Sequence, residues 1–260
     1  MKRTPLRALP EAIPEELHPF LDGADLYDSS CSPEARVYFI DKDGGYYLKI
    51  AAAGSLSREA VMNEYFYSRG LGVRVVAYIS EERDYMLTER ACGEDLTHER
   101  YLAEPLWLAT EMGRLLRRLH EIPADECPVS RMPEYLATVE ENYKNGVFDP
   151  SFLPEADKAV TADEAYAYVM NNAAHLRSDT LIHGDFCLPN VIFDGQKFSK
   201  LIDVGNGGIG DRHVDLFWGA WTLGFNLGTD EYRDAFLNSY GRDRIDERLI
   251  RLIAFAECFG

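Results

Sequence analysis

Two short apolar runs joined by a tight turn predict a β-hairpin in the second half of this chain. The runs cover residues 191–193 and 200–202, and the dipeptide Asp194-Gly195 stands between them. Asp-Gly between two apolar runs is typical of a hairpin turn. We therefore expect two paired strands here, with polar side chains at their ends.

The polar residues at the ends of this hairpin have the chemistry for phosphoryl transfer. Asp185 and Asn190 precede the first strand, and Asp203 follows the second. A carboxylate can accept the proton of an attacking hydroxyl group, which is the role we expect for Asp185. An amide and a second carboxylate suit Mg²⁺, so Asn190 and Asp203 are the candidate metal ligands. Each residue alone would be an ordinary turn residue, so the interpretation depends on the ordered set.

Three of these residues belong to a recognisable motif. The segments His183-Gly184-Asp185 and Ile202-Asp203-Val204-Gly205, with Asn190 between them, resemble the aminoglycoside phosphotransferases, and residues 187–190 are similar to the 3′-phosphotransferase branch. The resemblance implies an α+β, protein-kinase-like fold with two lobes. We expect an N-terminal nucleotide-binding lobe over residues 1–92, made of an antiparallel sheet and a helix. The remaining residues, 93–260, should form a mostly helical lobe for catalysis and substrate binding.

Charge and cysteine content narrow the classes of partner. The net charge of −17 argues against nucleic acid, which requires a basic face, and favours a polycationic small molecule. Acidity that serves only solubility is the alternative. The five cysteines show no Cys-x-x-Cys spacing, and no run approaches eighteen apolar residues. We therefore expect a cytoplasmic protein with neither a zinc site nor a membrane span, and a monomer.

A charged side chain interrupts a predicted strand in the first part of the chain. Residues 36–41 and 46–50 predict a hairpin, and Lys49 lies within its second strand, where a charge needs a partner. A helix is predicted over 57–69 with Ser57 as its cap, and it offers two candidate partners, Glu59 and Glu64. The register of the family selects Glu59, with Glu64 as the alternative. In kinases this ion pair positions the lysine on the phosphates; the plain alternative is an edge-strand lysine that reaches solvent.

Further nucleotide contacts are implied by the resemblance. A second hairpin is predicted over 73–80 and 85–88, with residues 81–84 as its turn. The loop that contains Ser32 corresponds to the family's nucleotide-covering loop. The backbone groups near Glu89 and Ala91 correspond to the hinge that pairs with the adenine of ATP, with GTP left open.

The second part of the chain has helical periodicity. Helices are expected over 104–120, 133–143, 161–175, 230–240 and 244–259, with a further helix after the metal-binding aspartate. Asp215 matches a family aspartate that braces the catalytic loop, and Asp211 is its neighbour in the motif. Glu155 and Glu257 correspond to acids that hold the amino groups of the substrate.

One departure from the family pattern concerns the substrate. Uncharged residues occupy positions where the resembling enzymes carry charges: Asn206, Trp221, Thr222 and Phe225. We expect an ATP- and Mg²⁺-dependent kinase that phosphorylates an aminoglycoside hydroxyl, the 3′-hydroxyl, and so confers resistance. The alternatives are a kinase of another small amino alcohol, such as choline, and a catalytically silent binding protein. A panel of cationic substrates would separate these three.

Overall fold

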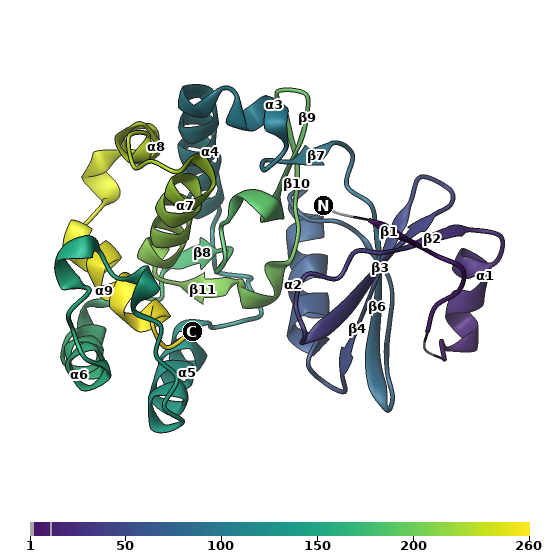
Figure 1. Ribbon diagram of the computed structural model, residues 1–260, viewed down its shortest axis with the longest axis horizontal. Helices are drawn as coiled ribbons and strands as arrows, with labels where there is room; N and C mark the ends of the chain where they lie inside the picture. Colours follow the sequence, from purple (N-terminus) through teal and green to yellow (C-terminus); the bar gives the residue numbers. More distant parts are fainter. Residues whose placement is uncertain (1–2, 11) are drawn as a thin grey trace. The chain divides into compact units, whose positions relative to one another are not determined.

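We analysed a computed structural model, which describes residues 3–10 and 12–260. Its contacts divide the chain into two compact units (Figure 1). The first unit comprises Met1–Asp95 and Pro189–Gly205, and the second comprises Leu96–Leu188 and Asn206–Gly260. The boundary that we expected between residues 92 and 93 lies near the first break. The hairpin at 189–205, which we expected in the second lobe, belongs to the first unit by its contacts.

The first unit is built on an antiparallel sheet with the strand order β1-β2-β3-β4-β6-β5. Its strands are β1 (Thr4–Leu6), β2 (Asp25–Asp28), β3 (Ala35–Asp41), β4 (Tyr46–Ala52), β5 (Val75–Ser80) and β6 (Arg83–Glu89). The β3–β4 hairpin that the sequence predicted is present, and its turn residues Asp43, Gly44 and Gly45 all have positive φ. The strands β1 and β2 were not predicted.

The hairpin between β5 and β6 is tighter than the sequence indicated. Asp84 was expected in the turn, but it lies in β6 and is completely buried. Its carboxylate accepts hydrogen bonds from the backbone N–H groups of Gly54 and Leu56 and from the hydroxyl groups of Tyr78 and Ser80. A buried carboxylate needs such donors, so Asp84 pins the loop before the first long helix to the sheet.

That helix, α2 (Ser57–Ser68), packs on the sheet through Leu56, Ala60 and Met86. The prediction that Ser57 caps it is wrong. Leu56 occupies the N-cap position without a side-chain bond, and the Ser57 hydroxyl donates to the carbonyl of Gly54.

A second, three-stranded sheet carries the polar hairpin. Its order is β10-β9-β7, where β9 is Val191–Asp194, β10 is Lys197–Leu201 and β7 is Glu94–Asp95. Gly93, with φ of 103°, lies against β9 so closely that an added Cβ would come within 2.1 Å of the Phe193 carbonyl oxygen. Only glycine fits there, because the positive φ disfavours other residues and the Phe193 carbonyl leaves no room for a Cβ atom.

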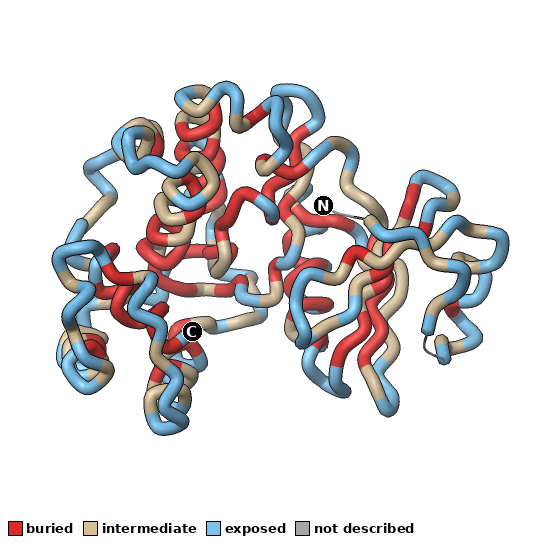
Figure 2. The backbone as a smooth tube through the Cα atoms, viewed as in Figure 1, coloured by how far each residue is buried: buried red, intermediate tan, exposed pale blue. Residues whose placement is uncertain are grey.

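The second unit is mostly helical. Its helices of eight residues or more are α4 (Pro105–His120), α5 (Met132–Lys144), α6 (Ala162–Asn172), α7 (Arg212–Leu227), α8 (Arg233–Tyr240) and α9 (Glu247–Glu257). A short antiparallel pair joins β8 (Thr180–Ile182) to β11 (Gly208–Gly210). Its buried residues gather on the helices α4, α7 and α9 and on the strand β8 (Figure 2). No helix within the described residues is long and apolar enough to cross a membrane.

Candidate active site

Lys49 is held between two carboxylates of the first unit. It lies in β4, and its Nζ atom is 2.7 Å from Glu59 Oε2 and 2.7 Å from Asp203 Oδ1. Glu59 comes from α2 and is buried, whereas Glu64 on the same helix is exposed. The structure therefore pairs Lys49 with Glu59 rather than with Glu64, and it adds Asp203 as a second partner.

The protonation of this cluster follows from burial and charge. Burial alone would lower the pKa of Lys49, but the carboxylates of Asp203 and Glu59 outweigh it, and the pKa is raised well above its ordinary value. Burial, together with the charge of Asp203, raises the pKa of Glu59 against the opposing effect of Lys49. Lys49 is therefore a fixed positive charge, as an ammonium group that binds phosphates must be.

Asp203 has an unusual backbone conformation. Its φ is 58°, in the left-handed region that residues other than glycine rarely adopt, and its side chain is 53% exposed. Aspartate tolerates this region better than most residues, and strain of this kind clusters at functional sites. Asp203 lies two residues after the end of β10, and the backbone N–H of the preceding Ile202 donates to the carbonyl of Asn190 at 3.0 Å. The two candidate metal ligands are thus joined through their backbones.

A pocket of about 520 Å³ in the first unit contains these groups. Five residues that the sequence assigned to nucleotide or metal lie in its lining together with Asn190: Lys49, Glu59, Glu89, Ala91 and Asp203. Ser32, which we expected to cover the nucleotide, is exposed and outside this lining, where Ser29 and Cys31 of the same loop take part. The pocket has the size of a small-molecule site.

Tyr47 and Arg3 are among the residues of this pocket that the sequence analysis missed. Tyr47 lies two positions before Lys49, so both side chains point to the same face of β4; this alternation was the available signal. Arg3 comes from the N-terminal segment. Its guanidinium lies 3.5 Å from the centre of the Phe39 ring and donates to the Tyr47 hydroxyl at 2.8 Å. Nothing in the local sequence indicated that Arg3 would reach this pocket.

The loop that carries Asp185 belongs to the second unit and is braced by Asp215. The backbone N–H groups of His183 and Gly184 each donate to the Asp215 carboxylate at 2.7 Å, and His120 Nε2 lies 3.0 Å from it. Gly184 has φ of 83°, and an added Cβ would come within 2.0 Å of the Asn206 carbonyl oxygen. The backbone before Asp185 is therefore fixed, and Asp215 occupies the bracing position that the sequence indicated.

Comparisons with known proteins identify the family. A profile of the phosphotransferase enzyme family matches residues 32–252. A protein of Lactococcus lactis named probable aminoglycoside 3′-phosphotransferase is 47% identical over 257 residues, which is 98% of each chain. An aminoglycoside 3′-phosphotransferase of Niallia circulans is 31% identical over 70% of each chain. The chain belongs to the aminoglycoside phosphotransferase family.

Solved structures agree with this assignment. The crystal structure of an aminoglycoside 3′-phosphotransferase of type VIII matches this phosphotransferase with a TM-score of 0.78 at 25% identity, over 92% of this chain and 94% of that one. An aminoglycoside phosphotransferase from Streptomyces rimosus matches with a TM-score of 0.71 at 22% identity, over 99% and 92%. The kinase-like fold and the enzyme class that the sequence predicted are confirmed.

The two acids assigned to the substrate lie in different surroundings within this phosphotransferase. Glu155 begins a 3₁₀ turn (Glu155–Asp157), and its side chain is 95% exposed. Glu257, near the end of α9, is buried and accepts a hydrogen bond from the Tyr135 hydroxyl at 2.8 Å. Burial, with the charge of Asp185 as a further cause, raises the pKa of Glu257 to about 7 although the Tyr135 bond opposes the shift.

Two positions of α7 where the resemblance implies charged residues carry aromatic ones. The rings of Trp221 and Phe225 stack at 5.0 Å between centroids, and Phe225 is 72% exposed. Between them along the helix, the Thr222 hydroxyl accepts a hydrogen bond from the backbone N–H of Leu188 at 3.2 Å. Leu188 follows Asp185 by three residues, so α7 contacts the loop that carries Asp185 through Thr222.

Proposed function

We propose that this phosphotransferase transfers the γ-phosphoryl group of ATP to the 3′-hydroxyl group of an aminoglycoside, and so confers resistance in the cytoplasm. The observation that carries the proposal is the arrangement around Lys49, whose ammonium group contacts Glu59 and Asp203. Kinases hold the phosphates of ATP with a lysine that a helix glutamate positions in this way. The choice of aminoglycoside, and of its 3′-hydroxyl, is supported by the names of the relatives.

The residues of the nucleotide pocket fit a magnesium ion. Asn190 and Asp203 both belong to its lining, and their side chains carry an amide oxygen and a carboxylate. Mg²⁺ prefers oxygen ligands and is usually bound by one or two protein groups together with phosphates and waters, so an amide and a carboxylate suffice. When bound, the ion would neutralise charge on the transferring phosphoryl group.

Asp185 would orient the acceptor hydroxyl group and accept its proton. As the proton moves to the Asp185 carboxylate, the hydroxyl oxygen forms a bond to the γ-phosphorus, and the bond from that phosphorus to the bridging oxygen breaks to release ADP. Asp215 fixes the backbone of His183 and Gly184, so the backbone position from which the Asp185 side chain starts is defined.

Glu155 and Glu257 are the acids that we propose for the ammonium groups of the drug. The side chain of Glu155 is 95% exposed and its ion pair with Lys158 is long, at 4.0 Å, so its carboxylate is accessible to an ammonium group at the surface. Glu257 already bonds to Tyr135, so its contribution would be made within a buried network, where a charge-assisted hydrogen bond is stronger.

One observation favours a second class of acceptor, a small amino alcohol such as choline. Phe225, which stacks on Trp221, is 72% exposed and offers an aromatic face on α7, the helix whose Thr222 contacts the loop that carries Asp185. Aromatic faces attract quaternary ammonium groups through cation–π interactions.

A phosphate-transfer assay with matched variants tests the proposal. With ATP and Mg²⁺, kanamycin-like substrates should be phosphorylated and choline should not, and Asp185→Asn should lower turnover by roughly 10²-fold or more with little change in folding. Near-normal turnover in folded Asp185→Asn would refute its role.

For the substrate acids, Glu257→Gln and Glu155→Gln should each raise the KM for the aminoglycoside, about five-fold for Glu257→Gln, without changing the KM for ATP. Unchanged aminoglycoside KM in both variants would contradict the assignment of these acids.

A further inference from the structure

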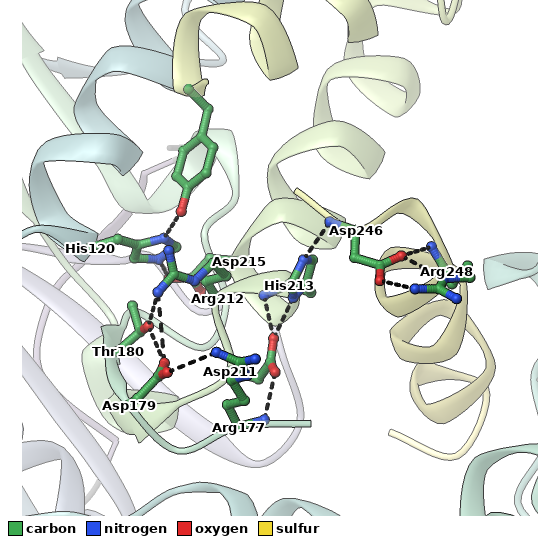
Figure 3. Close-up of polar contacts among 11 residues, drawn as sticks. His120, Arg177, Asp179, Thr180, Asp211, Arg212, His213, Asp215, Asp246 and Arg248 are labelled. Carbon is green, nitrogen blue, oxygen red and sulfur yellow. Dashed lines mark hydrogen bonds and ion pairs between the residues drawn. The ribbon is translucent and has the colours of Figure 1, made fainter. Parts of the chain in front are cut away.

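A second pocket, of about 730 Å³, lies wholly within the second unit. Its lining comes from the end of α6, the segment 175–179, the start of α7 and the segment 243–252. These segments are far apart in the sequence and contribute a group of arginines: Arg177, Arg212, Arg244, Arg248 and Arg251. Figure 3 shows Arg177, Arg212 and Arg248 arranged around Asp211 and His213. We call this group of residues the arginine pocket.

The carboxylates of the arginine pocket are engaged by neighbours. Asp246 accepts two bonds from the Arg248 guanidinium, at 3.1 and 2.7 Å. Asp211 lies 2.6 Å from the Nδ1 atom of His213 and accepts a bond from the backbone N–H of Arg177 at 2.7 Å. These partners satisfy the carboxylates and reduce their repulsion of an incoming anion.

The arginines of the pocket have more hydrogen-bond donors than their ion pairs use. The ion pair of Arg177 is with Asp179 at 4.0 Å, and that of Arg244 runs from its Nε atom to Asp243 at 3.3 Å. Each guanidinium carries five N–H donors, and both side chains are more than half exposed. Donor groups therefore remain available at two sides of the pocket, on a chain whose net charge is −17.

We propose that the arginine pocket is a second ligand site, which binds a small molecule carrying phosphate groups. The guanidinium groups come from separate segments and so approach from different directions. A tetrahedral phosphate accepts hydrogen bonds in several directions, whereas a planar carboxylate is matched by one guanidinium fork. The volume is within the range of small-molecule sites.

The floor of this pocket is connected to the catalytic loop. Arg212 Nη2 donates to the Thr180 hydroxyl at 3.0 Å, at the start of the strand that leads to His183. One turn further along α7, Asp215 accepts hydrogen bonds from the backbone N–H groups of His183 and Gly184. A bound phosphate that attracts Arg212 acts on both ends of β8, and thereby on the loop that carries the catalytic carboxylate.

Calorimetric titration of the full chain with inorganic pyrophosphate, without Mg²⁺, tests the site. Wild type should bind, and the double variant Arg177→Gln/Arg244→Gln should bind at least ten-fold more weakly. The matched control Arg114→Gln/Arg118→Gln removes the same charge from α4 of the same unit and should change the affinity less than two-fold. Lys49→Met removes the ammonium group of the nucleotide pocket and should leave this binding intact. Absence of binding to wild type, equal losses in the two double variants, or loss in Lys49→Met would overturn the proposal.

The link to the catalytic loop has its own readout. In the Lys49→Met protein, saturating pyrophosphate should change the hydrogen-exchange rates of the His183 and Gly184 amides, measured by NMR, at least three-fold. In the same protein with Arg177→Gln/Arg244→Gln the rates should not respond. Binding without any response of these amides would refute the coupling, because Asp215 holds both of them directly.

Discussion

Asp215 accepts a hydrogen bond from the backbone N–H of His183 at 2.7 Å, and so fixes the backbone that leads into Asp185. The aspartate is completely buried at the start of α7 and also contacts His120, which in turn lies 2.9 Å from the Tyr240 hydroxyl. The backbone position of Asp185, the residue that we propose as the proton acceptor, therefore depends on a carboxylate that is itself completely buried.

Replacing Asp215 by asparagine should impair both catalysis and stability. Asparagine offers one acceptor oxygen in place of two, so one of the two backbone N–H groups loses its partner in a buried position. We expect kcat to fall at least ten-fold with a small change in the KM for ATP, and the free energy of unfolding to fall by about 2–3 kcal/mol. Steady-state kinetics and urea unfolding measure the two effects. A variant with normal kcat would show that the bracing is not required.

The ion pair of Lys49 can be tested with two glutamates of one helix. Glu59→Gln removes the buried carboxylate that positions the lysine, and we expect kcat/KM for ATP to fall roughly ten-fold or more, which corresponds to ~1.4 kcal/mol of lost transition-state stabilisation. Glu64→Gln removes an exposed carboxylate of α2 and serves as the matched control. Equal effects of the two substitutions on kcat/KM would contradict the pairing.

Asp203 should control the dependence on magnesium. Asp203→Asn replaces the carboxylate of the proposed metal site with a weaker, neutral ligand, so Mg²⁺-dependent nucleotide binding and activity should be lost together. Asp194→Asn, a change at the exposed turn of the β9–β10 hairpin, is the control and should leave the Mg²⁺ titration unchanged. The measurement is nucleotide affinity as a function of Mg²⁺ concentration; superimposable curves for wild type and Asp203→Asn would refute the assignment.

The sequence predicted those parts of the fold that are encoded locally. The β3–β4 hairpin could be predicted from the alternating pattern of its own residues. The apolar face of α4 could be predicted from the helical spacing of its apolar residues. The strands β1 and β2 could not be predicted in this way, because three- and four-residue segments that contain Pro5 or two aspartates have little strand propensity. They form because they pair with the edge of a sheet that already exists, which is information from tertiary structure.

The same distinction applies to the site. Lys49 was recognisable because a charge stood within an apolar strand, and Asp203 because of its motif. The choice of Glu59 over Glu64 required the family register, since helical spacing alone permits either. Arg3 and Asp84 were missed because their roles depend on residues distant in the sequence that supply their partners.

Glu257 should make the stability of the protein depend on pH. Its pKa is raised from 4.5 to about 7, chiefly by burial. Between these two values the folded state holds a proton that the unfolded state has released. The contribution of Glu257 to the free energy of unfolding is therefore greatest below about pH 4.5. This contribution falls by up to ~3 kcal/mol as the pH rises toward and past 7.

Glu257→Gln removes this titration, since glutamine cannot ionise. The difference in free energy of unfolding between the variant and wild type should shift in favour of the variant by ~2–3 kcal/mol between pH 5 and pH 8, as measured by urea denaturation at each pH. Glu155→Gln, which changes an exposed acid, should show no such shift. Parallel pH profiles of unfolding free energy for wild type and Glu257→Gln would contradict this prediction. They would mean that the Glu257 carboxylate is as stable in its buried position beside Tyr135 and Asp185 as it is in the unfolded chain.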